Sequence, residues 1–458
     1  MKARNQLLKR HDRTRGKTWA SAAVAVTMVT GLSYAASPLA VASAASETPV
    51  TLTWQMWAGS QAEITAWDHD AAIVHSEFPW ITVNLTYDQP FGNYFTKFPT
   101  EIASNTEPDL VAIQSLRTTG FQGGLLPLTT AELDSDGMPG FNLMNFDQGI
   151  LNGLKNTSGQ QVALPYDFGP LMVYYNKTEF LKYKVPLPSI GWTWSQFNSD
   201  AALITKNSGG AVYGYINDPY LDQFIAYAVD HGASYLKNGQ LDIDTPAMAS
   251  LLASYVASVK ANESPLPPSN AAESNWWIYQ WIDGAGAMYI DGPWDMIFDL
   301  SSVKSGIANF KVGIAPLPVG PGGKSVSILA GSGFGISPDL YKDHPGMDKS
   351  VLLSDAIKAI EGLTSPTAEQ FLASAGRAFS ARTAQQKYWF STVEGLGVAS
   401  VTANMDAALQ NAVGYVTTNK WNGTTDAFDS QIVGVMQGSI TPKAALAYTQ
   451  ANQGTPAA

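Results

Sequence analysis

Apolar and polar residues alternate near position 50 and then recur at helical intervals, which predicts a strand followed by a helix. Residues 48–57 alternate, and the pattern stops at Gly59, as happens where a strand meets a loop. Ser60 and Glu63 have the spacing of a helix capping box, and the apolar residues behind them follow the helical period. We interpret Gln61 and Glu63 as residues of the helix start only.

Two further strands are predicted at 81–87 and 108–113, with a helix between them that is interrupted at Pro99. Strands that alternate with helices predict a parallel sheet covered on both faces. Ligands of such sheets bind where the carboxyl ends of the strands meet loops. The residues after these strands are therefore the first candidates for a binding site: Trp57 to Ser60, Tyr87 to Gln89 and Gln114 to Arg117.

The pattern after residue 160 predicts a second block of mixed elements. Residues 163–183 are expected to form a loop, a strand of bulky apolar residues and a short helix, and residues 211–232 a strand, a turn and a helix. A helix is predicted at 245–260, and strands are predicted at 311–318 and 325–337. The last hundred residues are mostly helical in pattern.

Length and charge narrow the classes of protein. A chain of 458 residues has room for two or three domains. The chain has 27 Lys and Arg residues and 38 Asp and Glu residues. Seven of the basic residues and one of the acidic residues lie in the first 17 positions, so the rest of the chain has 20 basic and 37 acidic residues. This excess argues against nucleic acid or an anionic membrane as a partner. Charged residues are only 14% of the chain. An acidic external medium would explain this, as would a secreted protein that is poor in lysine.

The first 44 residues are typical of an export signal. A basic segment is followed by an uncharged, alanine- and valine-rich stretch and by the small residues Ala42, Ser43 and Ala44. The stretch is too short and too often interrupted for a membrane anchor, so we expect residues 1–44 to be a signal peptide. The chain has no cysteine, which excludes disulfides, thiolate metal sites and a lipid-modified N-terminal cysteine.

Other motifs give no catalytic or metal site. Gly322 and Lys324 fall in a GGKS segment, but a phosphate loop would need glycine at Pro318 and a helix afterwards. His69 and His75 are not on one helical face, so neither a metal nor a cofactor is expected. No pair of carboxylates is singled out by its spacing as the acid and nucleophile of a glycosidase.

Six segments in order resemble a known family. They are PDLVAIQS to GLLPLT (108–129), YDFGPLMVYYNKTEF (166–180), WTWSQF (192–197), GAGAMYIDGPWDM (284–296), VGIAPLPVGPGGK (312–324) and GSGFGIS (331–337). The chain from about residue 50 onward resembles the extracellular solute-binding proteins of the sugar type, the maltose-binding-like receptors that feed carbohydrate ABC importers. The leader without cysteine departs from the lipoprotein form common in Gram-positive members.

The resemblance implies a two-lobed α/β fold of the periplasmic-binding-protein-like type II. Each lobe would be a mainly parallel sheet flanked by helices, with hinge strands between the lobes. We expect the N-lobe to comprise 45–165 and 331–363, and the C-lobe to comprise 166–330 and 364–458.

A sugar presents an apolar face and an edge of hydroxyls, so its site calls for aromatic rings and carboxylates that accept two hydrogen bonds. Trp294 follows a predicted strand behind Gly292 and Pro293, where the resemblance implies a stacking tryptophan. The other ligand-binding residues that the resemblance implies are Trp57, Ser115, Arg117, Asp167, Tyr220, Gly331, Ser332, Gly333 and Arg377.

Each of these residues also has a structural interpretation. Besides ligand binding, Trp294 and Trp57 also fit a place in the core, Asp167 also fits the cap of a turn, and Arg117 also fits a surface ion pair. Trp276, Trp277 and Trp281 are interpreted as packing residues, although one of the first two has the position to reach the cleft.

The resulting hypothesis is an exported, monomeric receptor that binds a carbohydrate, delivers it to the permease of an ABC importer and has no catalytic residues or cofactor. One alternative is the same fold with an anionic cargo such as a phosphate ester or glycerol phosphodiester, for which only Arg117, Arg377 and Arg382 are candidates. The other alternative is a secreted glycoside hydrolase.

Overall fold

The computed structural model describes residues 47–89, 92–135, 138, 140–269, 271, 276–304 and 310–454. The predicted signal peptide lies outside these residues. Among the described residues, none of the helices has both the length and the apolar character needed to cross a membrane. The following description concerns the unit that begins at Thr48.

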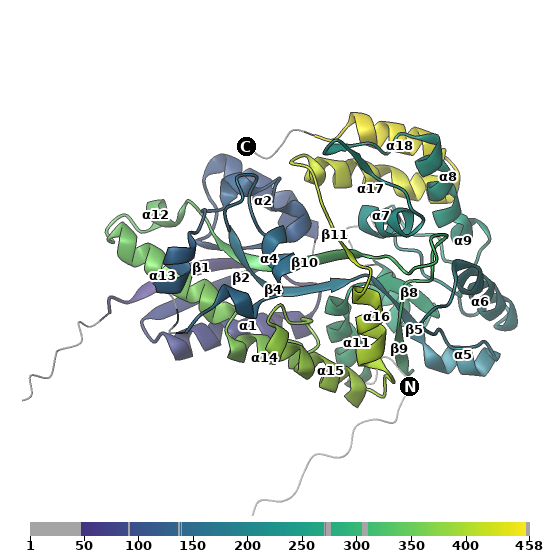
Figure 1. The fold of residues 1–458 in the computed structure, drawn as a ribbon, viewed down its shortest axis with the longest axis horizontal. Helices are drawn as coiled ribbons and strands as arrows, with labels where there is room; N and C mark the ends of the chain where they lie inside the picture. The colour runs from purple at the N-terminus through teal and green to yellow at the C-terminus, as the bar shows by residue number, and fades with distance from the viewer. Residues whose placement is uncertain are drawn as a thin grey trace, which may run out of the picture. The chain divides into compact units, whose positions relative to one another are not determined.

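A six-stranded sheet is built around β1 (Val50–Trp57), which is parallel to β2 (Ile81–Asp88) and to β3 (Leu110–Gln114). This confirms the three strands and the parallel pairing predicted for the start of the chain. The long strand β10 (Ile328–Ile336) then runs antiparallel between β3 and β4 (Ala163–Pro170). Figure 1 shows β10 beside β4. The short strand β11 (Val413–Gly414) pairs with the start of β10.

A second sheet has three strands. Its central strand β5 (Met172–Asn176) is antiparallel to both β8 (Met288–Asp291) and β9 (Val312–Pro316). The prediction of a mainly parallel sheet in each half is therefore wrong for this half. The reason is tertiary, since β5 pairs with strands that return from more than a hundred residues later. The strands β6 (Leu236–Lys237) and β7 (Gln240–Leu241) form a small hairpin that pairs with neither of these two sheets.

Several helices begin at polar side-chain caps. Ser60 caps α1 by accepting a hydrogen bond from the Glu63 amide, and Thr193 and Gln196 form a complete capping box on α6. The helices before β5 are α1 (Gln61–Glu77), α2 (Gly92–Ser104), α3 (Thr130–Ser135) and α4 (Gln148–Gly153). Those between β5 and β10 are α5 (Lys177–Tyr183), α6 (Trp194–Asn207), α7 (Leu221–Asp230), α8 (Pro246–Tyr255), α9 (Ala257–Lys260), α10 (Trp276–Ile282) and α11 (Met296–Lys304). The remaining helices are α12 (Leu340–Asp343), α13 (Lys349–Leu363), α14 (Pro366–Ser374), α15 (Gln386–Gly395), α16 (Val401–Leu409), α17 (Trp421–Gln437) and α18 (Pro442–Ala451).

Three local predictions are wrong. Helix α2 continues through Pro99, because its buried face holds it against the sheet. Residues 163–170 were expected to be a loop but form β4, because they pair with β10. The strand predicted near residue 211 is reduced to an isolated bridge at Tyr213, because the amides of Tyr215 and Asn217 donate to Glu263 and Ser264 instead of to a neighbouring strand.

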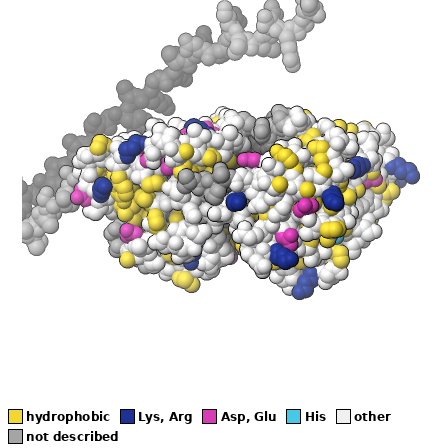
Figure 2. All heavy atoms as spheres, turned by 90° about the horizontal axis from the view of Figure 1, so that it is seen from above, with side chains coloured by type: hydrophobic (Ala, Val, Ile, Leu, Met, Phe, Trp, Pro, Cys, Tyr) yellow, Lys and Arg dark blue, Asp and Glu magenta, His cyan; other side chains and the backbone are white. Residues whose placement is uncertain are grey.

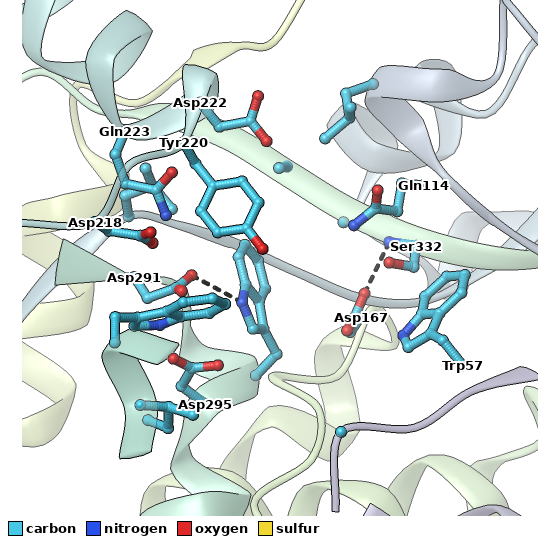
Figure 3. Close-up of a pocket in the computed structure, with 18 of the residues that line it drawn as sticks. Trp57, Gln114, Asp167, Asp218, Tyr220, Asp222, Gln223, Asp291, Asp295 and Ser332 are labelled. Carbon is cyan, nitrogen blue, oxygen red and sulfur yellow. Dashed lines mark hydrogen bonds between the residues drawn. The ribbon is translucent and has the colours of Figure 1, made fainter. Parts of the chain in front are cut away.

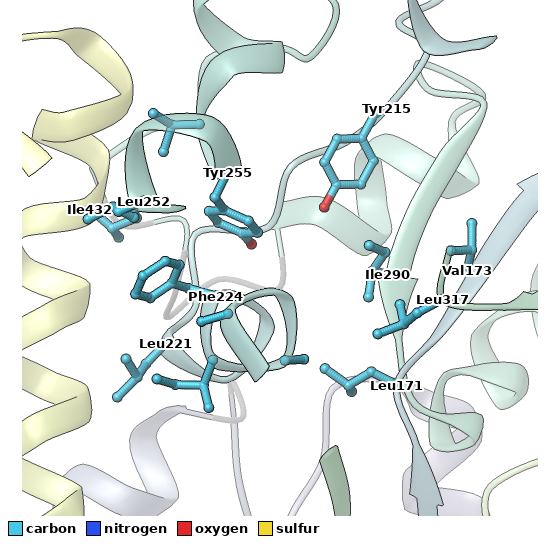
Figure 4. Close-up of a cluster of buried hydrophobic side chains, with 14 of the residues drawn as sticks. Leu171, Val173, Tyr215, Leu221, Phe224, Leu252, Tyr255, Ile290, Leu317 and Ile432 are labelled. Atoms are coloured by element: carbon cyan, nitrogen blue, oxygen red, sulfur yellow. The ribbon is translucent and has the colours of Figure 1, made fainter. Parts of the chain in front are cut away.

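Separate apolar cores lie against the two sheets. Figure 4 shows the core of the second sheet, which includes Phe224 of α7, Leu252 of α8 and Ile290 of β8. The core of the six-stranded sheet includes Trp54, which packs edge-on against Phe334 with ring centroids 5.1 Å apart. On the face drawn in Figure 2, charged side chains are scattered among larger uncharged areas. These cores fix the positions of the strand ends that meet at the site.

Candidate functional site

A cavity lies between the ends of the two sheets. Its empty volume, including the solvent-filled space at its opening, is about 1070 Å³. One side is formed by the ends of β1 and β3 and by the middle of β4 and β10. The other side is formed by the end of β8 and the starts of α7 and α10 (Figure 3).

Trp57 ends β1 and is held firmly in place. It is buried, with its ring edge-on to Tyr94 at 5.1 Å and tilted against Phe95 at 5.3 Å. Its remaining surface lines the cavity. Trp57 therefore packs in the core and also lines the cavity.

Asp167 and Arg377 form a buried ion pair at the back of the cavity. Arg377 Nη1 donates to Asp167 Oδ2 at 3.0 Å, and the Ser332 amide donates to Asp167 Oδ1 at 2.7 Å. The Arg377 Nε atom lies 2.7 Å from Glu63 Oε1, an ionic contact without hydrogen-bond geometry. Burial raises the pKa of Asp167 to about 6, although Arg377 opposes this rise. The interpretation of Asp167 as a turn cap is thus replaced by an ion pair.

Glu63 has a role that the sequence prediction missed. It lies at the start of α1, and its Oε2 atom accepts a hydrogen bond from the Gly59 amide at 2.6 Å. Its other oxygen faces Arg377, and the residue lines the cavity. The expectation that Glu63 belongs to the helix start only is therefore wrong, because the helix start itself lies at the cavity wall.

Trp294 stands in a short 3-10 helix directly after β8. Its Nε1 atom donates to Asp291 Oδ1 at 2.9 Å, and the half-buried ring lines the cavity. The ring folds back over Gly292, where an added Cβ atom would lie 2.2 Å from the indole. Glycine is required there by the close approach of the ring.

Tyr220 and Trp277 form a corner of the cavity. Their rings are nearly perpendicular, at 83°, with centroids 5.1 Å apart. Tyr220 precedes α7, and Trp277 belongs to α10. Of the three neighbouring tryptophans, Trp277 lines the cavity. Trp281 is fully buried and donates a hydrogen bond to Asp299.

Residues 61–339 match the bacterial extracellular solute-binding protein family. This chain belongs to that family. For three of the similar solved structures, the alignment in each case covers 88% of this chain. An ABC substrate-binding protein from Listeria monocytogenes in complex with cycloalternan has 20% identity, a TM-score of 0.75 and 98% of its chain covered. Maltose-bound MalE3 of T. maritima has 21% identity, a TM-score of 0.68 and 98% of its chain covered. The maltose-maltodextrin binding protein of Alicyclobacillus acidocaldarius has 18% identity, a TM-score of 0.67 and 100% of its chain covered. These similarities confirm the predicted fold class, the periplasmic-binding-protein-like fold.

Arg117 is buried in this solute-binding protein and does not form the surface ion pair considered from the sequence. It donates to Gln114 at 2.9 Å and to Asn422 at 2.8 Å, and its guanidinium lies over the Phe95 ring at 4.2 Å. Arg117 and Gln114 both line the cavity. Because α17 supplies Asn422, this arginine joins the end of β3 to a helix from the end of the chain.

Two predicted residues are not among those that line the cavity. Ser115 accepts a hydrogen bond from the Gly331 amide at 3.3 Å, and Gly333 faces Leu154 and the Leu164 carbonyl. Gly331 and Ser332 do line it, and a Cβ atom on Gly331 would lie 2.3 Å from the Asp167 carbonyl. Small residues on β10 are therefore needed for the close pairing of β10 with β4.

The cavity also contains carboxyl groups that the sequence prediction did not single out. They are Asp218, Asp222, Asp291 and Asp295. A signal was present, since Asp291 and Asp295 flank Trp294 in the DGPWD segment. What the sequence did not indicate was that Asp218, more than seventy residues earlier, would share a cavity with them.

Proposed function

We propose that this chain is the extracytoplasmic substrate-binding component of an ABC importer, which binds a sugar or oligosaccharide and delivers it to the permease. It would act as a monomer, without a cofactor and without a catalytic step. Residues 1–44 would export it and then be removed. A location outside the cytoplasm follows from its membership of an extracellular family.

The observation that carries this proposal is the lining of the cavity. Trp57 and Trp294 come from opposite sides, and Asp167 lies in the same cavity. Flat rings suit the apolar face of a pyranose, and a carboxylate accepts hydrogen bonds from two hydroxyls. The solved neighbours bound to cycloalternan and to maltose support a carbohydrate ligand.

We further propose that the cavity lies between two lobes, with an N-lobe of 45–165 and 331–363 and a C-lobe of 166–330 and 364–458. Two of these boundaries fall inside β4 and β10, which pair side by side. Closing of the lobes on the ligand would shift an equilibrium between open and closed forms, and the closed form would dock on the permease.

Within this site, Trp294 would stack on the ligand and Asp167 would accept hydroxyl hydrogen bonds. Trp57, Tyr220, Gly331 and Ser332 would complete the contacts. Arg117 and Arg377 would act mainly by fixing neighbouring side chains, because both already have polar partners. Ser115 and Gly333 would support β10 from behind.

A thermal-shift panel of mono- and oligosaccharides tests the proposal, since a ligand that binds only the native state raises the melting temperature. At least one carbohydrate should raise it, and Trp294→Ala should weaken that ligand. Failure of every carbohydrate over a broad panel would contradict the proposal.

The two alternatives have less support. An anionic cargo needs free cations, but Arg377 pairs with two carboxylates and Arg382 donates to the Thr364 carbonyl and lies over the Phe146 ring. A glycoside hydrolase would release reducing ends from oligosaccharides. Incubation of the protein with its tightest oligosaccharide ligand should release none.

A further inference from the structure

One wall of the cavity combines aromatic rings with carboxyl groups. We call it the aromatic–acidic wall. Its members are Asp218, Tyr220, Trp277, Asp291, Trp294 and Asp295. In Figure 3 the carboxyl groups of Asp218, Asp291 and Asp295 lie on the same side of the cavity as the ring of Tyr220, whereas Asp167 lies on the other side.

The rings of this wall meet at steep angles. Tyr220 and Trp277 are nearly perpendicular, and the Trp294 indole is held by its hydrogen bond to Asp291. The face of an aromatic ring carries partial negative charge and attracts cations. Because Tyr220, Trp277 and Trp294 all line the cavity, the ring faces that they expose there favour a cation.

Two carboxyl groups of the wall have oxygens without a hydrogen-bond partner among the described residues, although the Asp295 side chain also interacts with Asp291 by a hydrogen bond. Asp218 is fully buried, and neither of its oxygens has a hydrogen-bond partner among the described residues. Asp295 is 4% exposed, and its Oδ2 atom is likewise unpartnered within the described part of the chain. A buried acceptor without a partner is costly, and a ligand that donates to it recovers this cost.

The charged groups that act on these two carboxyls are all acidic. For Asp218 they are Asp222, Asp291 and Asp429, and for Asp295 they are Asp291, Asp299 and Glu63. Arg117, which lines the same cavity, acts on Asp222, Asp429 and Tyr220. Among the described residues, no base therefore belongs to the charged groups that act most strongly on Asp218 and Asp295.

We propose that the aromatic–acidic wall binds a protonated amino group, so that the cargo is a carbohydrate that carries an amine. This inference rests on the proposed function and narrows its substrate class. Ring faces attract the ammonium, and the unpartnered oxygens of Asp218 and Asp295 accept its N–H groups. A neutral sugar would satisfy the same oxygens without using the charge.

Binding of an amine should be accompanied by loss of a proton. Burial, and then the neighbouring carboxylates, raise the pKa of Asp218 and of Asp295, which favours their protonated forms in the empty cavity. An arriving ammonium favours the carboxylate, and the proton of the carboxyl group leaves to solvent. A neutral sugar gives no such charge and should release no proton.

Matched sugar pairs test the inference. Glucosamine is compared with glucose, and the deacetylated disaccharide of glucosamine is compared with cellobiose, by calorimetry in two buffers that differ in ionisation enthalpy. In at least one pair the amine should bind at least about tenfold more tightly, as expected for charge-assisted hydrogen bonds. It should release protons, and its affinity should rise between about pH 5 and pH 7, where the amine stays protonated.

Two variants assign the effect to the wall. Asp218→Asn and Asp295→Asn keep the side-chain shape and remove the charge, and each should abolish the amine preference and reduce proton release. Because each removes a buried acid, neither should lower the melting temperature. Asp244→Asn makes the same change at an exposed residue before α8 and should leave the preference intact.

Equal or tighter binding of the neutral sugars would overturn the inference and leave the proposed function standing. Affinity for a neutral sugar that rises as the pH falls would also overturn it, since undissociated carboxyl groups would then be the recognising form. If no amine sugar binds, the inference fails as well, and the broader carbohydrate panel decides the proposed function separately.

Discussion

Arg377 donates from Nη1 to Asp167 Oδ2 at 3.0 Å, which joins a residue of the last hundred to the strand β4. The same guanidinium lies 2.7 Å from Glu63 at the start of α1. Asp167 in turn accepts the amide hydrogen of Ser332 in β10. One buried cation therefore ties together segments that the sequence keeps far apart, at the back of the candidate site.

Replacing Arg377 with methionine should destabilise the protein by about 3 to 5 kcal/mol, because it leaves Glu63 and Asp167 buried without a cation. Urea unfolding at neutral pH measures the loss. The loss should shrink below about pH 6, where Asp167 becomes protonated. Lys182→Met, which breaks an exposed pair with Glu179, should change stability by less than about 1 kcal/mol. An equal loss in both variants would contradict the role of Arg377.

Replacing Trp294 with alanine should weaken carbohydrate binding by about 1 to 3 kcal/mol, from lost stacking and lost apolar area. Calorimetry with the tightest sugar measures the change. Trp294→Phe should recover part of the affinity, because it keeps a ring but loses the bond to Asp291. Trp80→Ala, whose indole donates to Asp355 instead, is the control. Unchanged affinity in Trp294→Ala would refute the stacking role.

Replacing Gly292 with alanine should displace the indole of Trp294, because the new Cβ atom would lie 2.2 Å from it. We expect a loss of about 1 to 3 kcal/mol in stability, as for other overpacked sites, together with weaker sugar binding. Gly322→Ala is the matched control, since no heavy atom lies within 4 Å of a Cβ atom there. Similar behaviour of the two variants would show that the indole moves without cost.

The protein should be more stable in mild acid than at neutral pH. Burial raises the pKa of Asp299 and of Glu107 to about 7 and that of Asp167 to about 6. A carboxyl group whose pKa is higher in the folded than in the unfolded protein stabilises the folded state fully at a pH below its unfolded-state pKa of about 4. This stabilisation is lost as the pH rises through the folded-state pKa. Melting temperatures should therefore fall between about pH 5 and pH 8.

Asp299→Asn isolates one contribution to this pH dependence. The variant should lose less stability than the parent between about pH 5 and pH 8, because a neutral amide replaces a group that ionises in that range. A tenfold difference between the folded and unfolded acid dissociation constants corresponds to about 1.4 kcal/mol of stability. A melting temperature that rises steadily toward pH 8 would contradict the buried, neutral state of these carboxyl groups.

The sequence determined much of the fold because its signals are local. Alternation marked β1, short apolar runs marked β2 and β3, a capping box marked the start of α1, and ordered motifs identified the family. It also placed Trp294 correctly after a strand. The side chain that follows a strand end in an α/β sheet commonly reaches a ligand cavity, so the local pattern was sufficient.

Tertiary structure alone decided the rest. Residues 163–170 became a strand only through pairing with β10, and Glu63 met a cation only because Arg377 is brought beside it. The unpartnered state of Asp218 likewise depends on which charges gather around it. Backbone preference is a property of neighbouring residues, whereas burial, pairing and pKa depend on residues that are distant in the chain and adjacent only in the folded protein.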